Sequence, residues 1–267
     1  MVLDQISEII KFIKSSGTGF YTNSYSNLAE VSDKNFQYFY NDGALAVCFD
    51  DGPVKRLLYF CNDFSFLKDV FNLVPSGEYL VEKVERNGFE DKLDLCNLGL
   101  SKIKRLYYYS TNKISDLFST NNPVLKYSGI EESNVLCVDS FYEIRDILYS
   151  IFDARISHLP DDELLEKKIA LGEFVGVFKD GKIVSLLQRK IDNKSFYINQ
   201  VVNLGPKACI HSLMIKELNS FIESGGKIVY SWIAEDNIAS IKFHEKYGLV
   251  RGPKYVTVYS LIKSDSN

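Results

Sequence analysis

The chain has 267 residues, of which 46% are hydrophobic and 25% are charged, and its formal net charge is −4. This composition can fill a core, which excludes a disordered chain, and the length predicts one large or two small domains. No apolar run approaches the roughly 20 residues that cross a bilayer, and the acidic balance excludes a basic nucleic-acid surface, so we expect neither a membrane nor a nucleic acid as partner.

The N-terminal segment predicts a cytoplasmic protein, because Asp4 and Glu8 stand where a secretory signal has a basic region. The cysteines are scattered without a C-x-x-C pair, which argues against a disulfide framework and predicts buried, reduced thiols. These cysteines are residues 48, 61, 96, 137 and 209. The three histidines, His158, His211 and His244, have no ligand-like spacing to acids or cysteines, so we expect no metal site.

The first half of the chain contains a strong hairpin signal. Two apolar runs within residues 46–58 flank the dipeptide Asp51-Gly52, which favours a tight β-turn. A helix is expected at 64–71, and another should end near Cys96 before a strand at 106–110. The polar stretch 111–134 is typical of a junction, so we predict two domains, 1–126 and 127–267.

The second half predicts a longer series of elements. A strand at 135–138 precedes a helix that starts at Ser140, whose spacing to Glu143 is that of a capping box. A further helix is expected at 159–170, then strands at 174–178, 183–191 and 196–203, with a turn at Asp180-Gly181. Apolar periodicity predicts a long helix at 207–224, followed by a strand at 228–233 and a last strand at 255–261.

The two halves resemble each other in two places. The hairpin at 46–58 matches the one at 176–187, and the glycine stop and strand at 96–110 match those at 246–260. We therefore infer an internal duplication. The first copy is shorter, because its helix follows the hairpin almost at once and leaves no room for the strand and loop that the second copy has at 195–211.

The segment 237–249 predicts a helix that Asn237 or Asp236 caps and Gly248 ends. It resembles the last helix of the GNAT superfamily of acyltransferases in its Asn, Phe, Glu-Lys and Gly positions, and the element order over 134–262 agrees. The resemblance implies an α+β or α/β protein with two GNAT-like domains, each a mixed, mostly antiparallel sheet flanked by helices. The N-terminal domain would be truncated and degenerate, and unable to hold a CoA pyrophosphate.

The resemblance also implies that acetyl-CoA binds as co-substrate where the long helix begins, since helix N–H groups and the helix dipole attract phosphate. Pro206, Cys209 and His211 depart from the family's Arg or Gln, Gly and small residue. The alternative for this segment is an ordinary helix start, at which Cys209 and His211 pack against neighbouring residues. Asn237 is alternatively a plain helix cap. The implied cofactor-binding residues are Val201, Val202, Lys207, Ala208, Cys209, Ile210, His211 and Asn237.

His244 stands where the family has a tyrosine that protonates the departing thiolate. A histidine with its ordinary pKa of roughly 6.5 would serve as this general acid. The alternative is a helix-surface histidine paired with a carboxylate. The strand at 195–201 contains no carboxylate, so the general base is unassigned, with Glu235 a weak candidate.

These features support one leading function and two alternatives. The leading function is an acyltransferase that moves an acetyl group from acetyl-CoA to the amine of a small molecule, peptide or protein. The first alternative is a catalytically inactive GNAT-fold binding module that has lost the pyrophosphate loop. The second is a transferase that uses charged tRNA, as in Fem-like tandem proteins, which the acidic balance disfavours.

Overall fold

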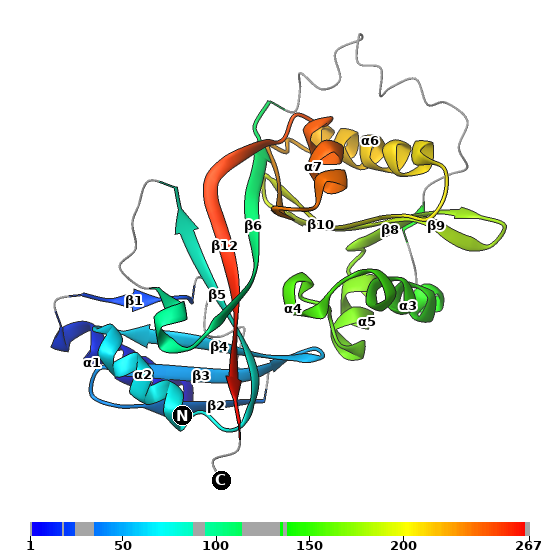
Figure 1. Cartoon of the computed structure of the whole chain (residues 1–267). Helices are drawn as coiled ribbons and strands as arrows, with labels where there is room; N and C mark the ends of the chain where they lie inside the picture. The colour runs from blue at the N-terminus through cyan, green and yellow to red at the C-terminus, as the bar shows by residue number, and fades with distance from the viewer. Residues whose placement is uncertain are drawn as a thin grey trace. The chain divides into compact units, whose positions relative to one another are not determined.

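The computed structural model describes residues 2–17, 19–24, 35–87, 94–113, 134–135 and 138–264. The described residues form two compact units (Figure 1). Unit 1 comprises Met1–Arg105, Phe152–Asp161 and Tyr255–Asn267, and unit 2 comprises Leu106–Ile151 and Asp162–Lys254.

The elements of the first half are α1 (Val2–Ser16), β1 (Tyr21–Thr22), β2 (Phe36–Tyr40), β3 (Ala44–Asp51), β4 (Val54–Cys61), α2 (Phe64–Leu73), β5 (Gly77–Arg86), η2 (Leu95–Leu98) and β6 (Ser101–Thr111). Those of the second half are β7 (Asn134–Val135), η5 (Val138–Ser140), α3 (Phe141–Ile151), α4 (Ala154–Ser157), α5 (Asp162–Ala170), β8 (Phe174–Lys179), β9 (Lys182–Asp192), β10 (Ser195–Asn203), α6 (Lys207–Glu223), β11 (Ile228–Ala234), α7 (Ile238–Glu245) and β12 (Val250–Lys263).

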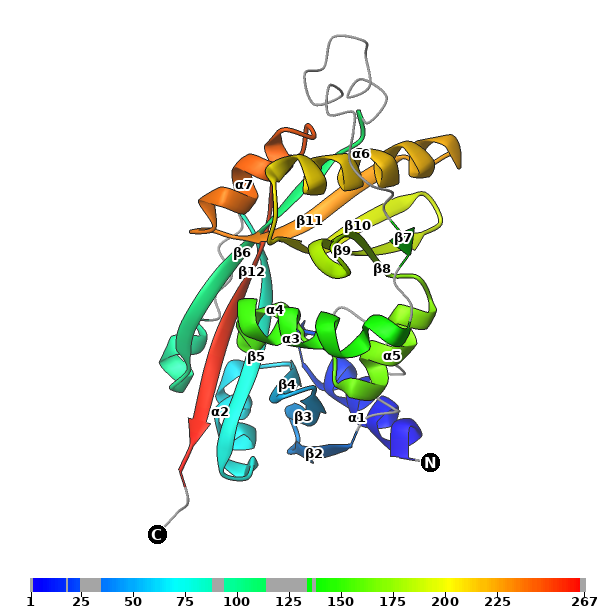
Figure 2. The same ribbon diagram turned by 90° about the vertical axis from the view of Figure 1, so that its right-hand side faces the viewer.

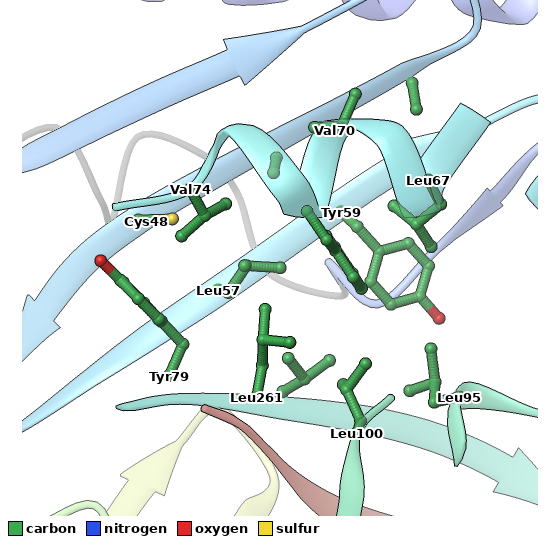
Figure 3. Packing of buried hydrophobic residues seen from close by; sticks show 14 of the residues in the cluster. Cys48, Leu57, Tyr59, Leu67, Val70, Val74, Tyr79, Leu95, Leu100 and Leu261 are labelled. Carbon is green, nitrogen blue, oxygen red and sulfur yellow. The ribbon is translucent and has the colours of Figure 1, made fainter. Parts of the chain in front are cut away.

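In unit 1, strand β3 is buried on both faces. Because successive side chains of a strand point to opposite faces, Leu45 and Val47 pack with Ile6 and Ile13 of α1. The alternate residues, Ala46 and Cys48 among them, pack on the other face with α2. Figure 3 shows this second layer, in which side chains of α2, β3 and β4 meet others from β5, η2 and β12. The labelled members are Cys48, Leu57, Tyr59, Leu67, Val70, Val74, Tyr79, Leu95, Leu100 and Leu261.

Both expected hairpins are confirmed. In unit 1, β3 and β4 pair up to Asp51 and Val54, and Gly52 takes a positive φ of 61°. In unit 2, β8 and β9 pair up to Lys179 and Lys182, with φ of 53° at Asp180 and 75° at Gly181. The two successive positive φ values in unit 2 are the geometry of the tight turn that Asp-Gly favours. In unit 1 the expected Asp51-Gly52 turn is shifted by one residue: Asp51 is the last residue of β3, and the turn consists of Gly52 and Pro53, with glycine at the first central position.

The sheet of unit 2 has the strand order β6-β11-β10-β9-β8-β7. All neighbours are antiparallel except β10 and β11, which are parallel. Helix α6 covers one face, where Phe221 packs edge-on against Phe196 of β10 at 5.4 Å. Helices α3 and α5 lie on the opposite face (Figure 2). The expected long helix and the three strands before it are therefore confirmed.

The last strand of each half is divided between the units. Residues 106–111 of β6 lie in unit 2 and pair with β11. The C-terminal part of β12 lies in unit 1 next to β5, and its Tyr259 and Leu261 belong to the core of that unit. The compact units are thus interleaved along the chain rather than consecutive. The expected division between residues 126 and 127 lies outside the described residues.

Several local expectations are corrected. The helix expected to end near Cys96 is only the single turn η2, which Gly99 ends with a φ of 85°. The Glu143 carboxylate, expected to complete a capping box with Ser140, accepts a hydrogen bond from the Ile183 N–H at 2.7 Å. Cys48, Cys61 and Cys209 are buried as expected, whereas Cys96 is exposed because η2 lies at the surface; Cys137 lies outside the described residues.

Candidate functional site

The sheet of unit 2 splits between its two parallel strands. Pairing of β10 with β11 covers Ser195, Phe196 and Tyr197 and stops at the pair Tyr197–Tyr230. Beyond this point β10 stays paired with β9 as far as Asn203, after an irregularity between Ile198 and Gln200. Strand β11 stays paired with β6 as far as Ala234. Because each strand keeps its outer neighbour and loses its inner one, the C-terminal halves of β10 and β11 separate.

Ser231 marks the point at which the strands separate. Its buried hydroxyl donates a hydrogen bond to the Ile198 carbonyl at 2.9 Å. A side chain therefore satisfies a backbone acceptor that parallel pairing would otherwise satisfy. Val201 and Val202, predicted to contact the cofactor, lie on β10 beyond the last pair; Val201 is partly exposed and Val202 is buried. No feature of the sequence singled out Ser231.

Helix α6 starts just after β10, as expected, with Pro206 as its N-cap and no side-chain capping bond. The Cys209 N–H donates to the Pro206 carbonyl at 2.9 Å, and α-helical spacing directs the N–H groups of Ile210 and His211 to carbonyls within the helix. Lys207 and Ala208 are the residues of this turn whose N–H groups have no intrahelical acceptor by position. The expected phosphate site therefore reduces to two backbone donors and the exposed Lys207 ammonium.

The side chains of Cys209 and His211 are turned into the protein. Both are buried. The Nδ1 atom of His211 lies 2.6 Å from the Tyr247 hydroxyl, and the ring stacks on Phe243 at 5.3 Å. Burial lowers the pKa of His211, and Lys246 and Lys207 lower it further, so the ring is neutral. Residue 211 thus joins α6 to α7, instead of projecting from the exposed side of the helix start.

Asn237 is the N-cap of α7 and follows the end of β11. Its side-chain oxygen accepts a hydrogen bond from the Ser240 N–H at 3.0 Å, and the residue is exposed. The capping role expected from the sequence is confirmed. The starts of α6 and α7 therefore stand at the C-terminal ends of the two strands that separate.

His244 is 2% exposed and lies on α7. Its Nδ1 atom is 2.8 Å from the Ser240 carbonyl oxygen, which can only accept, so Nδ1 carries the proton and Nε2 presents a lone pair. Nε2 is buried and has no hydrogen-bond partner among the described residues. Burial lowers the pKa of His244 despite the bond to Ser240. In this neutral form Nε2 accepts a proton, whereas the role expected from the sequence requires it to donate one.

Helix α7 contacts α6 through Phe243, whose ring stacks on His211 at 5.3 Å. Tyr247, in the turn that follows α7, is the hydrogen-bond partner of His211. Polar side chains of β10 near the split are held in place by hydrogen bonds: the Tyr197 hydroxyl donates to the Asn199 side-chain oxygen at 3.1 Å, and the Asn199 amide donates to Gln188 at 2.9 Å. Gln200 is buried and Glu235 is exposed.

His158 belongs to a closed ring of ion pairs in unit 1. Asp51 accepts hydrogen bonds from Arg56 Nε at 2.6 Å and from His158 Nδ1 at 3.1 Å. Glu82 accepts from Arg56 Nη1 at 2.8 Å and from His158 Nε2 at 2.7 Å. Burial alone would lower the pKa of His158, but Glu82 and Asp51 overcome this effect and raise it to about 9. The charged ring fastens the segment 152–161 to the β3–β4 hairpin.

Among the described residues, no helix is long and apolar enough to span a bilayer. No group of three or more His, Cys, Asp or Glu side chains among them is placed to hold a metal ion.

No family model matches the sequence, and no curated protein matches it at the level of sequence. Solved structures match it in fold. A tandem GNAT protein from the clavulanic acid biosynthesis pathway is 10% identical with a TM-score of 0.56, and the match covers 99% of this chain and 95% of that one. A GNAT-family acetyltransferase from Colwellia psychrerythraea is 13% identical with a TM-score of 0.52, covering 98% and 97%.

A GCN5-related N-acetyltransferase from Sphaerobacter thermophilus is 11% identical with a TM-score of 0.54, covering 82% of this chain and 76% of that one. At such low identities the likeness concerns the fold alone. The match to the tandem protein extends over almost the entire chain, so it includes both halves.

Proposed function

Because the chain has the GNAT fold in a two-domain arrangement, we propose that unit 2 transfers an acetyl group from acetyl-CoA to the amine of a small molecule or peptide. The observation that carries the proposal is the split between β10 and β11 after Tyr197 and Tyr230. Where two strands separate, the backbone N–H and C=O groups that faced the lost neighbour are open to a ligand. An extended ligand that contains amide groups can form hydrogen bonds with them, as an added strand would.

The residues fit acetyl-CoA as follows. Val201 and Val202, beyond the last strand pair, supply backbone groups for the amides of the pantetheine arm and for the thioester carbonyl. The N–H groups of Lys207 and Ala208, with the Lys207 ammonium, take the pyrophosphate at the start of α6. Cys209, Ile210 and His211 support this turn from inside, and Asn237 holds the start of α7.

The reaction requires one proton to move from nitrogen to sulfur. The amine nitrogen attacks the thioester carbonyl carbon, a C–N bond forms, and the C–S bond breaks. The lone pair on His244 Nε2 accepts the proton that the nitrogen loses and returns it to the departing thiolate. The Ser240 carbonyl keeps the other ring nitrogen protonated throughout. His244 thereby fills both the acid role expected from the sequence and the unassigned base role.

Thermal unfolding with acetyl-CoA tests the binding step. Ligand at 100 times its dissociation constant should stabilise the protein by about 2.7 kcal/mol. Lys207→Glu should weaken binding, because a carboxylate replaces the cation at the phosphate site. Lys194→Glu makes the same charge change at the opposite end of β10, where Lys194 is also exposed, and should leave binding unchanged.

One outcome would favour the alternative function. If millimolar acetyl-CoA gives no shift, the protein is a GNAT-fold binding module. The observation that favours the binding module is the small number of backbone donors at the start of α6: Pro206 has no N–H, and the Cys209 N–H is already bonded to the Pro206 carbonyl.

A further inference from the structure

The sheet of unit 1 contains a second split, between the parallel strands β4 and β5. Their pairing ends at the pair Arg56–Leu80. Beyond this pair β4 stays paired with β3 as far as Cys61, and β5 continues with β12 as its other neighbour. Each strand again keeps its outer neighbour and loses its inner one, so the internal duplication extends to the split itself.

Strand β1, which follows helix α1, lies against the part of β4 that β5 leaves. It pairs with β4 in antiparallel fashion, with Thr22 opposite Phe60 (Figure 1). Successive side chains reach opposite faces of the sheet. Phe20 packs in the layer of α1, and the ring of Tyr21 lies 4.2 Å from the ring of Phe64 in α2. Strand β1 is therefore a member of the sheet, with a hydrophobic layer on either side.

Asn23 continues this contact with its side chain. Its amide nitrogen donates a hydrogen bond to the Leu57 carbonyl at 3.0 Å, and its side-chain oxygen accepts one from the Tyr59 N–H at 2.6 Å. Asn23 is 5% exposed, and a buried amide without such bonds would cost stability. A primary amide has the donor and the acceptor of a peptide group, so Asn23 bonds to β4 as the backbone of an added strand would. We call residues 19–24 the internal strand.

The two splits differ in what bonds to their open strand. In unit 2, the backbone of β10 beyond Tyr197 is the part to which the proposed function assigns the pantetheine arm. In unit 1, the equivalent backbone of β4 is bonded to the internal strand.

We propose that the split of unit 1 is a strand-binding site, that its ligand is the internal strand anchored by Asn23, and that it is closed to the extended amide arm of acetyl-CoA. The closure to acetyl-CoA rests on the proposed function. The chain therefore contains two splits but one acetyl-CoA site, in unit 2.

Hydrogen exchange of backbone amides distinguishes the two edges of β4. Successive N–H groups of a strand point to opposite edges. The Tyr59 N–H bonds to the internal strand, so the Leu58 and Phe60 N–H groups face β3. All three should be protected from exchange in the wild-type protein, because each has a partner strand. A Tyr59 N–H that exchanges as fast as an exposed amide would overturn the proposal, and this measurement needs no variant.

Asn23→Ala should release the internal strand locally. The variant leaves a donor and an acceptor of β4 without partners, so the Tyr59 N–H should exchange about 5- to 150-fold faster. The Leu58 and Phe60 N–H groups should keep their wild-type rates. Asn72→Ala makes the same change at an exposed position of α2 and should leave the Tyr59 rate unaltered. Equal acceleration of all three amides, or none at Tyr59, would overturn the anchoring role of Asn23.

Titration of the full chain with acetyl-CoA tests the closure of unit 1. Calorimetry should give one acetyl-CoA per chain, and Lys207→Glu should weaken this binding without revealing another. Two acetyl-CoA molecules per chain would overturn the closure even if unit 2 is a transferase. If no acetyl-CoA binds, the proposed function fails, and the exchange rate of the Tyr59 N–H still decides whether the internal strand is the ligand of the split.

Discussion

The imidazole of His244 is held in one tautomer by a backbone carbonyl, and its second nitrogen is buried and has no hydrogen-bond partner in the part of the chain that the structure describes. A buried polar atom that lacks a partner costs stability. This arrangement is understandable if a substrate supplies the missing partner. The same atom is then the proton acceptor of the proposed reaction.

Replacement of His244 by Phe should therefore separate activity from stability. We expect kcat to fall by about 10²- to 10⁴-fold, the usual contribution of a general acid–base group. The KM for acetyl-CoA and the thermal midpoint should change little, because Phe fills the space and leaves no buried acceptor. Steady-state kinetics with calorimetry measure both, and an unchanged kcat would remove His244 from the mechanism.

The pH dependence of activity follows from the lowered pKa of His244. Burial keeps the imidazole neutral at pH values where an ordinary histidine is protonated. As the proton acceptor it is active when neutral, so the acid limb of kcat/KM should lie below the ordinary pKa of about 6.5. A limb above that value in the wild-type profile would contradict this assignment.

His158 predicts a pH dependence of stability with the opposite sign. Its pKa is raised to about 9 in the folded protein, so its contribution is complete below about pH 6.5 and is lost as the pH rises through about 9. The side chain is half-exposed, so the contribution should be of the order of 1 kcal/mol. In the variant His158→Asn, the new residue tolerates the positive φ of 45° at this position. The variant should be less stable than wild type at pH 6 and equally stable near pH 10. A stability difference that does not change with pH would exclude the ion-pair ring.

At the scale of elements, Gly52 and Gly181 both lie in two-residue hairpin turns, Gly52 at the first and Gly181 at the second turn position, and they have different surroundings. Both have positive φ, and a non-glycine residue there costs about 1–2 kcal/mol. A Cβ at Gly52 would lie 2.3 Å from the Leu159 carbonyl oxygen, whereas one at Gly181 would meet nothing within 4 Å. Gly52→Ala should therefore lose at least about 1 kcal/mol more than Gly181→Ala in denaturant unfolding. Equal losses would show that the hairpin does not touch the segment 152–161.

The elements that the sequence predicts well are those defined by local signals. Both Asp-Gly hairpins, the long helix at 207–223 and the helix capped by Asn237 depend on residues within a few positions of one another. The split of β10 from β11 depends on which outer partners the strands keep, and β6 lies far away in sequence. The ring of His158, Asp51 and Glu82 likewise joins residues 107 and 76 positions apart. No periodicity records such pairings.

At the scale of the whole molecule, the core of unit 1 depends on the end of the chain. Leu261 is 5% exposed and belongs to that core, whereas its neighbour Ile262 is 72% exposed. Leu261→Ala should cost about 2–5 kcal/mol, and Ile262→Ala less than about 0.5 kcal/mol. Hydrogen exchange should locate the loss from Leu261→Ala in β3, β4 and β5. Faster exchange confined to unit 2 would refute the assignment of the C-terminal part of β12 to the core of unit 1.

The division of β6 and β12 between the units also affects synthesis of the chain. Strand β5 pairs with β4 on one side, and its other neighbour is β12; Glu78 and Ser260, which bond across this junction, are 182 positions apart. At about 5–20 residues per second, a ribosome needs about 10–40 s to make the intervening chain. During that time β5 has an open edge that can pair with other nascent chains. The unit that emerges first is therefore completed last, and a stalled ribosome would release it in its most aggregation-prone form.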